Sequence, residues 1–401
     1  MDPTTLTEWG PAQEVDLPTG IAHALRQRGI VDVTPTEHSG RWELRARRWV
    51  GVITVSHLGE RWQLTIQPKL PIDRIAFLLG YARNPHFWTT ERVQIESASG
   101  LPEALARAFG RVATECLAQG VLMGYRTVDE SLQVLRGRVR EADQVRRRWG
   151  LGLPLEVHYD DFTVDIAENQ ILLAATLALL RTAAVSATHR PALHRLRLLL
   201  ADVTPLPRGR PRPAWRSSRL NTGYGPALAL AELVLDCQSF HHRHGDVEMT
   251  GFMVDMDKVF EDFVCVGLRE ALRPRQTHLQ YRTHLDTGRQ VPMRPDFVWT
   301  EHGRPKVVAD AKYKSDDGGN PDLYQMFAYC SRLEVPTGHI VNAGGAPSTP
   351  YELPGGVRVF AHSLTLDGSP AELLNQLESI GDHMCASAFH MTASDERTGH
   401  G

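Results

Sequence analysis

Two aspartates and a lysine within residues 294–314 have the types and spacing that phosphodiester hydrolysis requires. The segment reads RPDFVWTEHGRP and then KVVADAKYK. Side chains alternate along a strand, so Asp310 and Lys312 are expected on the same face. Asp296 and Asp310 are equidistant from Gly303, which lies between the two expected strands. An antiparallel hairpin about Gly303 would place the two aspartates opposite each other, with Cβ atoms about 4.5–5.5 Å apart.

Two opposed carboxylates require a compensating cation, because like charges directly across a strand pair destabilise a sheet. Carboxylate oxygens suit Mg²⁺, with Mn²⁺ as the alternative. Such an ion lowers the pKa of its bound water and polarises a phosphate. Lys312 would stabilise the developing charge or orient the attacking water. The pattern predicts a metal-dependent hydrolytic site in which Asp296, Asp310 and Lys312 are catalytic and both aspartates bind the metal.

The flanking helices offer three further candidates. Glu261 lies beside an apolar stripe in the sequence KVFEDFV, and we expect it as a third metal ligand, with a surface salt bridge as the alternative. Asp262 is expected in solvent. Gln325 and Tyr329 are one helical turn apart, so both can reach one site and position a DNA backbone. The alternative for Tyr329 is simple packing.

Other polar groups carry weaker hypotheses. The run His241–His244 could bind metal, but a flexible loop is the preferred interpretation. Asp165 or Asn169 is expected to cap the helix that comes next in the chain. No GxxxxGK[ST] loop occurs, so nucleotide-binding residues are predicted to be none.

The elements that must position these residues form an α/β pattern near the C-terminus. They are expected as a helix over 258–272, strands over 290–300 and 306–314, a helix over 322–333 and a strand over 339–342. Short alternating segments before residue 110 predict a β-rich region. Apolar residues at spacings of three and four predict mostly helix after it. The expected domains are therefore 1–110 (β-rich), 111–245 (helical) and 246–385 (catalytic), with a flexible tail over 386–401.

Length and composition limit the number of domains and the class of protein. A chain of 401 residues suggests two or three domains, and 42% hydrophobic with 23% charged residues excludes a disordered or fibrous protein. The net charge of −3 excludes a generally basic nucleic-acid binder, so any DNA contact must come from a local patch. Five scattered cysteines without CxxC spacing predict a reducing cytoplasm. We expect no signal peptide and no membrane span; the apolar segment 171–180 is too short and predicts a buried helix.

The chain resembles the McrC family, the nuclease subunit of McrBC-type 5-methylcytosine restriction systems, within the PD-(D/E)xK nuclease superfamily. Pro295-Asp296 supplies the "PD", Asp310-Ala-Lys312 the "DxK", and Gln325-Met-Phe-Ala-Tyr329 resembles the QxxxY motif of the RecB-like branch. Matching segments spread over roughly residues 45 to 330. They are 51–55, 64–69, 135–139, 165–180, 256–264, 308–314 and 322–325.

This resemblance implies an α+β multidomain protein with a C-terminal restriction-endonuclease-like core. It implies a Mg²⁺-dependent DNA endonuclease that serves restriction and phage defence. The partner would be a McrB-like AAA+ GTPase ring that reads the modified cytosine and whose GTP hydrolysis this chain stimulates. Residues 1–110 would be the docking region, and double-stranded DNA the substrate. The basic run 41–48 is a candidate for that contact, although a solvated strand face is the preferred interpretation. Two alternatives remain: a stand-alone RecB-like nuclease, and a non-catalytic adaptor of an AAA+ ring.

Overall fold

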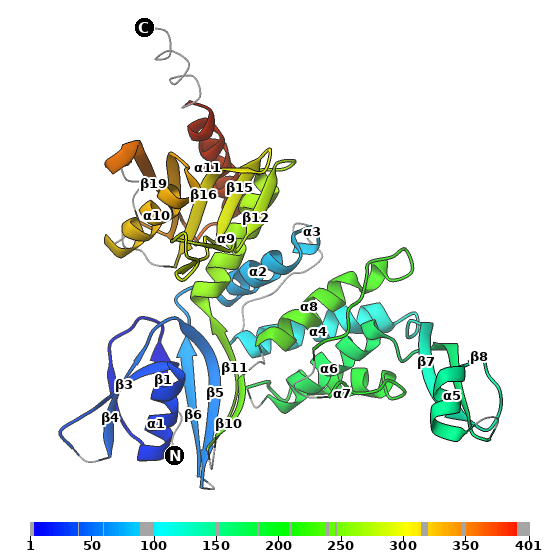
Figure 1. Cartoon of the computed structure of the whole chain (residues 1–401). Helices are drawn as coiled ribbons and strands as arrows, with labels where there is room; N and C mark the ends of the chain where they lie inside the picture. The colour runs from blue at the N-terminus through cyan, green and yellow to red at the C-terminus, as the bar shows by residue number, and fades with distance from the viewer. Residues whose placement is uncertain are drawn as a thin grey trace. The chain divides into compact units, whose positions relative to one another are not determined.

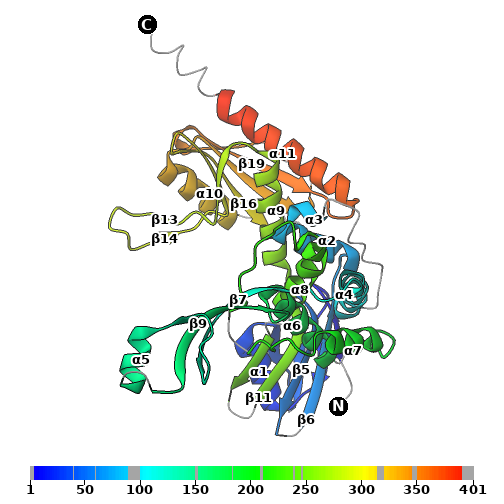
Figure 2. The same cartoon turned by 90° about the vertical axis from the view of Figure 1, so that its right-hand side faces the viewer.

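The chain folds as a mixed α+β protein with several separate sheets, which confirms the predicted class (Figures 1 and 2). It forms two compact units, the first from Met1–Leu101 with Ser239–Gly401 and the second from Pro102–Gln238. The second unit is thus inserted between two segments that fold together. This computed structural model describes residues 4–38, 40–58, 60–88, 100–149, 152–182, 184–207, 211–237, 240–244, 247–313, 320–345 and 350–390.

A five-stranded sheet in the first unit joins strands that are far apart in the sequence. Its order is β1-β6-β5-β11-β10. The strands are β1 (Thr4–Thr7), β5 (Trp49–His57), β6 (Glu60–Gln67), β10 (Phe240–His244) and β11 (Val247–Asp255). Strand β11 pairs with β5 along its whole length. The strands of this one sheet therefore come from all three of the expected domains.

Gly51 and Gly251 permit the close approach of β5 and β11. A Cβ on Gly51 would lie 2.1 Å from the Phe252 carbonyl oxygen, and one on Gly251 would lie 2.5 Å from that of Val52. Gly51 also has φ +126°, which L-residues rarely adopt.

A smaller sheet and one helix complete the N-terminal part. The order is β2-β4-β3, with β2 (Gln13–Asp16), β3 (Val31–Pro35), β4 (Arg41–Ala46) and helix α1 (Thr19–Arg28). Ile21, Leu25 and Leu44 share one hydrophobic core with Trp62 and Leu64 of the five-stranded sheet. Helices α2 (Ile72–Arg83) and α3 (Pro85–Trp88) come next in the chain.

The C-terminal part contains a six-stranded mixed sheet of order β12-β15-β16-β17-β19-β18. Its strands are β12 (Gln276–Leu279), β15 (Phe297–Glu301), β16 (Arg304–Lys312), β17 (Thr337–Ala343), β18 (Tyr351–Leu353) and β19 (Val357–Leu364). The central strands β16, β17 and β19 run parallel, and the outer ones are antiparallel. A short ribbon, β13 (Thr283–His284) with β14 (Pro292–Met293), and the turn η2 (Pro354–Gly356) lie between strands.

Helices cover both faces of this sheet. They are α9 (Met256–Ala271), α10 (Asn320–Leu333) and α11 (Pro370–His390). Met326 of α10 packs with Ile340 of β17, whereas Ser387 of α11 contacts His339, the residue before it. Neighbouring residues of a strand point to opposite faces, so α10 and α11 lie on opposite sides. Figure 2 shows α11 running along one side of the sheet.

Helix α9 connects the five-stranded sheet and the six-stranded sheet of the first unit. Asp255 ends β11, and its side chain accepts a hydrogen bond from the Asp257 amide to cap α9. Phe77 and Tyr81 of α2 pack edge-on against Phe263 of α9, with ring centroids 5.9 and 5.5 Å away. The helix thus has a fixed start and an aromatic anchor, which set the position of Glu261.

The second unit combines helices with a three-stranded sheet of order β7-β9-β8, so the predicted middle region is not helical throughout. Its elements are α4 (Leu101–Leu117), β7 (Gly124–Leu132), β8 (Arg138–Val139), α5 (Glu141–Arg148), β9 (Leu155–Thr163), α6 (Ala167–Arg181), α7 (Arg190–Leu199), η1 (Thr222–Tyr224) and α8 (Gly225–Cys237). Helix α6 is buried, which confirms the prediction for 171–180.

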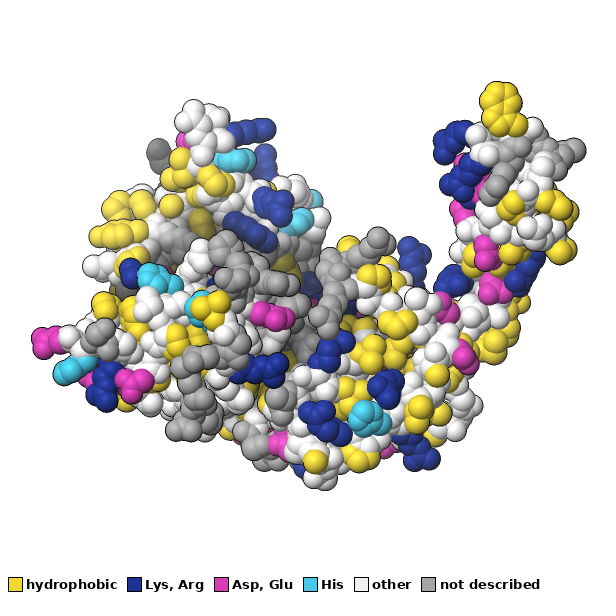
Figure 3. Space-filling model, turned by 90° about the horizontal axis from the view of Figure 1, so that it is seen from below, with side chains coloured by type: hydrophobic (Ala, Val, Ile, Leu, Met, Phe, Trp, Pro, Cys, Tyr) yellow, Lys and Arg dark blue, Asp and Glu magenta, His cyan; other side chains and the backbone are white. Residues whose placement is uncertain are grey.

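Figure 3 shows hydrophobic, basic and acidic side chains intermixed on the part with β7, β9 and α5, at its right. No helix of the described residues is long and apolar enough to cross a membrane.

The strands and helices predicted near the C-terminus agree with the structure except at their ends. The strand expected over 290–300 is two strands, β14 and β15, because the chain between them carries Pro295, which has no N–H to pair. The tail expected from residue 386 begins as helix, since α11 continues to His390. Residues 391–401 lie outside the described residues.

Candidate functional site

Asp296 and Asp310 lie next to each other, as the sequence predicts. Phe297 pairs with Ala309 in the β15–β16 hairpin, so the next pair outward is Asp296 with Asp310. Both side chains are buried, at 9% and 4% exposure. Two carboxylates buried this close together require a cation or protons.

The hairpin reaches this register through a turn and a bulge. His302 and Gly303 form the turn, with φ +50° and +76°, and Glu301 pairs with Arg304. This turn alone would centre the hairpin between residues 302 and 303. A register shift between Trp299 and Thr300 moves the centre to residue 303 for the rest of the ladder. The symmetry about Gly303 that the sequence suggested is therefore correct at the site.

Asp296 is held by hydrogen bonds from two directions. Its Oδ2 accepts from the Ala311 amide at 3.0 Å, and its Oδ1 accepts from Gln280 Nε2 at 2.9 Å. The same Gln280 nitrogen donates to Glu261 Oε1 at 2.5 Å. Gln280 thus fixes two carboxylates from different elements at one point.

Gln280 has no counterpart among the residues predicted from the sequence. It comes directly after β12 and has φ +51°. The backbone N–H of Gln280 donates to the backbone carbonyl of Asp296, and this bond continues the β12–β15 pairing by one residue. Only knowledge of that pairing could have pointed to Gln280.

Glu261 extends from α9 toward the two aspartates, as predicted. Burial, followed by the charge of Asp296, raises the pKa of Glu261 to about 7. Asp262 instead forms an ion pair with Lys258 at 3.0 Å. The structure therefore separates the two adjacent acids, one at the site and one on the surface.

Lys312 joins the carboxylates to α10. Its Nζ lies 2.5 Å from Asp310 Oδ2, 3.0 Å from Gln325 Oε1 and 4.0 Å from Asp322. Gln325 Nε2 in turn donates to the Tyr329 hydroxyl at 2.7 Å. Tyr329 is buried in the core between α10 and the sheet, so it both packs and supports Gln325.

Electrostatics show that the carboxylates lack sufficient positive charge. Burial and then Asp296 raise the pKa of Asp310, and Lys312 offsets only part of this. For Lys312, burial lowers the pKa, but Asp310, Asp322 and Asp296 together outweigh burial, so the net shift is upward. Asp310 Oδ2 is buried and receives no hydrogen bond of regular geometry. The carboxylates of Glu261, Asp296 and Asp310, with this buried oxygen among them, form a donor set that fits Mg²⁺ or Mn²⁺.

The residues expected to cap the buried helix α6 do something else. The N-cap is Ile166, without a side-chain cap. Asp165 pairs with Arg126 and accepts from the Thr204 hydroxyl, while Asn169 donates to the Val164 carbonyl. Both side chains tie loops to the helix instead of capping it.

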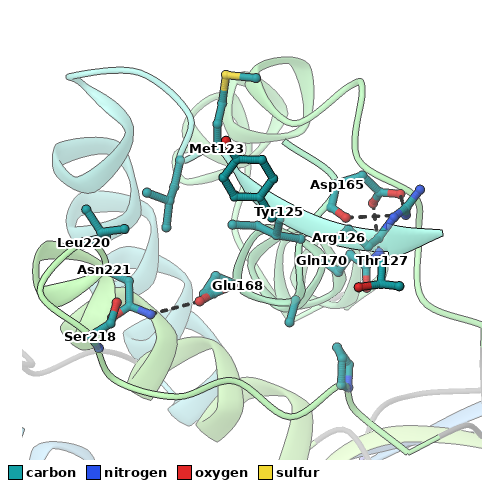
Figure 4. A pocket seen from close by; sticks show the side chains of 15 residues that line it. Met123, Tyr125, Arg126, Thr127, Asp165, Glu168, Gln170, Ser218, Leu220 and Asn221 are labelled. Atoms are coloured by element: carbon teal, nitrogen blue, oxygen red, sulfur yellow. Dashed lines mark hydrogen bonds and ion pairs between the residues drawn. The ribbon is translucent and has the colours of Figure 1, made fainter. Parts of the chain in front are cut away.

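A cavity of about 490 Å³ lies beside these residues in the second unit (Figure 4). Asn221 donates to Glu168 at 2.9 Å in its wall, and the Arg126–Asp165 pair forms another part. These polar groups satisfy one another, so the cavity presents no paired carboxylates comparable with those of the first unit.

The structure describes two other polar runs, residues 241–244 and 41–48. Residues 241–244 form strand β10 instead of the expected loop, although their side chains lie outside the described residues. In the basic run, Arg41, Arg47 and Arg48 pair with Asp16, Asp32 and Asp255. These pairs agree with the solvated strand face that was preferred.

Residues 44–341 match the model of the family described as McrBC 5-methylcytosine restriction system component. The chain belongs to this McrBC family. The resemblance predicted from the sequence is thereby confirmed. The matched range contains all six predicted site residues: Glu261, Asp296, Asp310, Lys312, Gln325 and Tyr329.

Two solved structures are similar to this McrBC-family chain, and the first of them supports its fold. One is a refined half-complex from a tetradecameric assembly of Thermococcus gammatolerans McrB AAA+ hexamers with bound McrC; it is 18% identical, with a TM-score of 0.58 over 96% of this chain and 100% of that one. The cryo-EM structure of the T. gammatolerans McrBC complex has 19% identity and a TM-score of 0.37 over 69% and 89% of the two chains. A search of curated proteins finds no match.

Proposed function

We propose that this chain is the DNA endonuclease subunit of a McrBC-like modification-dependent restriction system. The observation that carries the proposal is the meeting of four side chains from separate elements. Glu261 comes from α9, Asp296 directly precedes β15, and both Asp310 and Lys312 lie on β16. Family membership supports a role in restriction. In this proposal, the C-terminal part is a PD-(D/E)xK nuclease core that hydrolyses phosphodiesters of double-stranded DNA.

Each residue has a distinct proposed task. Asp296, Asp310 and Glu261 would hold Mg²⁺, or Mn²⁺ in its place. When bound, that ion would supply a water of lowered pKa and polarise the phosphate. Lys312, kept charged by Asp310, would stabilise the negative charge that develops on the phosphoryl oxygens.

Neighbouring residues would keep this arrangement in place before DNA arrives. Gln280 holds Glu261 and Asp296 together, so less side-chain ordering is needed on metal binding. Gln325 accepts from Lys312, and Tyr329 fixes the Gln325 amide. We propose that Gln325 and Tyr329 position the DNA backbone through this chain of contacts.

The proposed partner is a McrB-like AAA+ ring that binds and hydrolyses GTP. The similar solved structure contains McrB hexamers with bound McrC, and this sequence has no P-loop of its own. We propose that residues 1–110 dock on the ring and that the partner reads the modified cytosine. All five cysteines are free, which supports action in the reducing cytoplasm.

The experiment is cleavage of methylated and unmethylated plasmid in Mg²⁺, by the chain alone and with a McrB-like AAA+ protein plus GTP. Glu261→Gln is compared with Asp262→Asn, its exposed neighbour on α9. We expect cutting of methylated plasmid only with partner and GTP, abolished or strongly reduced in Glu261→Gln and retained in Asp262→Asn. Equal cutting by the chain alone would favour a stand-alone nuclease. Absence of cutting with stimulated partner GTPase would favour an adaptor.

A further inference from the structure

Three histidines from three elements meet in the C-terminal part of the first unit. They are His339 of β17, His362 of β19 and His383 of α11, and one ring nitrogen from each lies within 4.8 Å of the others. His339 is fully buried, His362 is half-buried and His383 is exposed. The cluster therefore runs from the core to solvent, and an ion could enter from the His383 side.

This cluster is separate from the carboxylate site. His339 lies on the α11 face of the sheet, since Ile340 beside it packs against α10. Val308 packs on the α10 face, and Asp310, two residues along β16, shares that face. The histidines and the carboxylates thus lie on opposite faces of one sheet.

Hydrogen bonds fix which nitrogen of His339 carries its proton. The Ser387 hydroxyl donates its only proton to the Met384 carbonyl at 2.9 Å. Its contact with His339 Nε2 at 3.3 Å therefore requires Nε2–H to be the donor. The neutral ring then has a lone pair on Nδ1, which faces His362 Nε2 at 3.0 Å. A histidine that donates through one nitrogen and offers a lone pair at the other has the arrangement of metal ligands.

We propose that His339, His362 and His383 bind a transition-metal ion of the Zn²⁺ class that fastens α11 to β17 and β19. The donors are Nδ1 of His339, Nε2 of His362 and a ring nitrogen of His383. Tetrahedral Zn²⁺ with bonds of about 2.0–2.1 Å places its nitrogen ligands roughly 3.3 Å apart. The 3.0 Å between His339 and His362 is already near this spacing. His383, exposed on α11, can rotate to close the set, and water supplies the fourth ligand.

The protonation of the rings supports the same conclusion. Burial and the neighbouring imidazoles lower the pKa of His339, and burial and then His383 lower the pKa of His362 to about 4. Neutral rings near pH 7 are the form that binds metal. On binding, His362 moves its proton from Nε2 to Nδ1 through solvent, so no net proton is released there.

Ligand chemistry distinguishes this site from the carboxylate site on the other face. Imidazole nitrogens suit Zn²⁺, Co²⁺, Ni²⁺ and Cu²⁺, whereas Mg²⁺ prefers oxygen donors. The proposed ion therefore cannot be replaced by the Mg²⁺ of the proposed nuclease function. Its presence or absence does not depend on whether that function is correct.

The test is a Co²⁺ titration of the full chain, purified without a histidine tag and dialysed against a chelator. Tetrahedral cobalt gives intense visible bands, while octahedral cobalt in a carboxylate site gives weak ones. We expect stoichiometric intense bands that Zn²⁺ abolishes and Mg²⁺ does not, together with a rise in Tm on Zn²⁺ addition. His383→Ala should remove the bands and the rise in Tm. Ser387→Ala should weaken binding by about 10–100-fold, as loss of an outer-shell partner does.

Two matched variants keep the test specific. His194→Ala removes an exposed histidine from helix α7 and should leave the titration unchanged. Joint replacement of His241, His242 and His244 by Ala removes the other histidine run and should also leave it unchanged. Intense bands that persist in His383→Ala, or no intense bands in the wild-type chain, would overturn the proposal.

Discussion

Lys312 is shared between a buried carboxylate and a helix amide, and this sharing determines its charge and its direction. Asp310 raises the pKa of Lys312 against the effect of burial, and Gln325 Oε1 accepts a hydrogen bond from the ammonium. The ammonium is thus charged and aimed before any substrate binds. An aimed charge in a buried site is worth more than the same charge in water, because little reorganisation is needed during the reaction.

Lys312→Ala should lower the single-turnover rate of DNA cleavage by about 10²–10³-fold, the usual effect of removing one charge-stabilising donor. The measurement is plasmid cleavage with the partner and GTP at saturating Mg²⁺. Lys306→Ala is the matched control, since Lys306 lies on the same strand and pairs with Glu301 at 3.5 Å. A rate for Lys312→Ala within about twofold of that of Lys306→Ala would contradict the assigned role.

Glu261 should make the metal-free protein less stable as pH rises. Its folded pKa of about 7 lies above the ordinary value of 4.5, so the folded state binds the proton more tightly than the unfolded state. This contribution to stability is complete below pH 4.5 and is lost as pH rises through 7. In chelator, the Tm of wild type should therefore fall more between pH 5 and pH 8 than that of Glu261→Gln. Equal falls in the two proteins would show that Glu261 has no raised pKa.

Individual site residues could be predicted where the signal is local. Strand alternation places Asp310 with Lys312, and helical spacing places Gln325 with Tyr329. Gln280 could not be found this way, because its role depends on the pairing of β12 with β15 across intervening loops. The histidine cluster was missed for the same reason, since its members are brought together by three elements distant in sequence.

The β15–β16 hairpin and α10 give the site its geometry as elements. A bulge corrects the register set by the tight turn, and Gly338 lets α10 lie close to β17. A Cβ on Gly338 would lie 2.6 Å from the Met326 side chain and 2.7 Å from Cys330 Sγ. Helix α10, which carries Gln325, must shift if that space is filled.

Gly338→Ala should destabilise the protein by about 1–3 kcal/mol, as overpacking of a close-packed core does. It should also slow DNA cleavage, because displacement of Gln325 releases Lys312. Gly223→Ala is the control, since a Cβ there meets nothing within 4 Å, and it should change stability by less than about 0.5 kcal/mol. Denaturant midpoints measure both. If the two variants had the same midpoint, α10 would not be held at Gly338.

Elements near the site were predicted well because their patterns are contiguous. The helices expected over 258–272 and 322–333 are observed as α9 (Met256–Ala271) and α10 (Asn320–Leu333). Strand β11 was not predicted, since its partner β5 lies about two hundred residues earlier in the chain. The sheet of the second unit was missed because helical periodicity dominates the segments around it.

In the whole molecule, the five-stranded sheet and the six-stranded sheet belong to one unit. Strand β11 completes the first sheet and leads directly into α9, which carries Glu261. The buried Glu8 carboxyl lies against the hydroxyl of Tyr313, the residue after Lys312. The proposed docking region thus meets the elements of the carboxylate site at two places, the pairing of β5 with β11 and the contact of Glu8 with Tyr313.

The most direct test is to measure plasmid cleavage and GTP hydrolysis in the same reaction, with the AAA+ partner, Mg²⁺ and methylated DNA. Asp310→Asn keeps the shape of the site but removes one carboxylate. We predict that it abolishes cleavage while stimulation of the partner's GTPase remains within about twofold of wild type. Full cleavage by Asp310→Asn would contradict the assignment of the nuclease site to these residues.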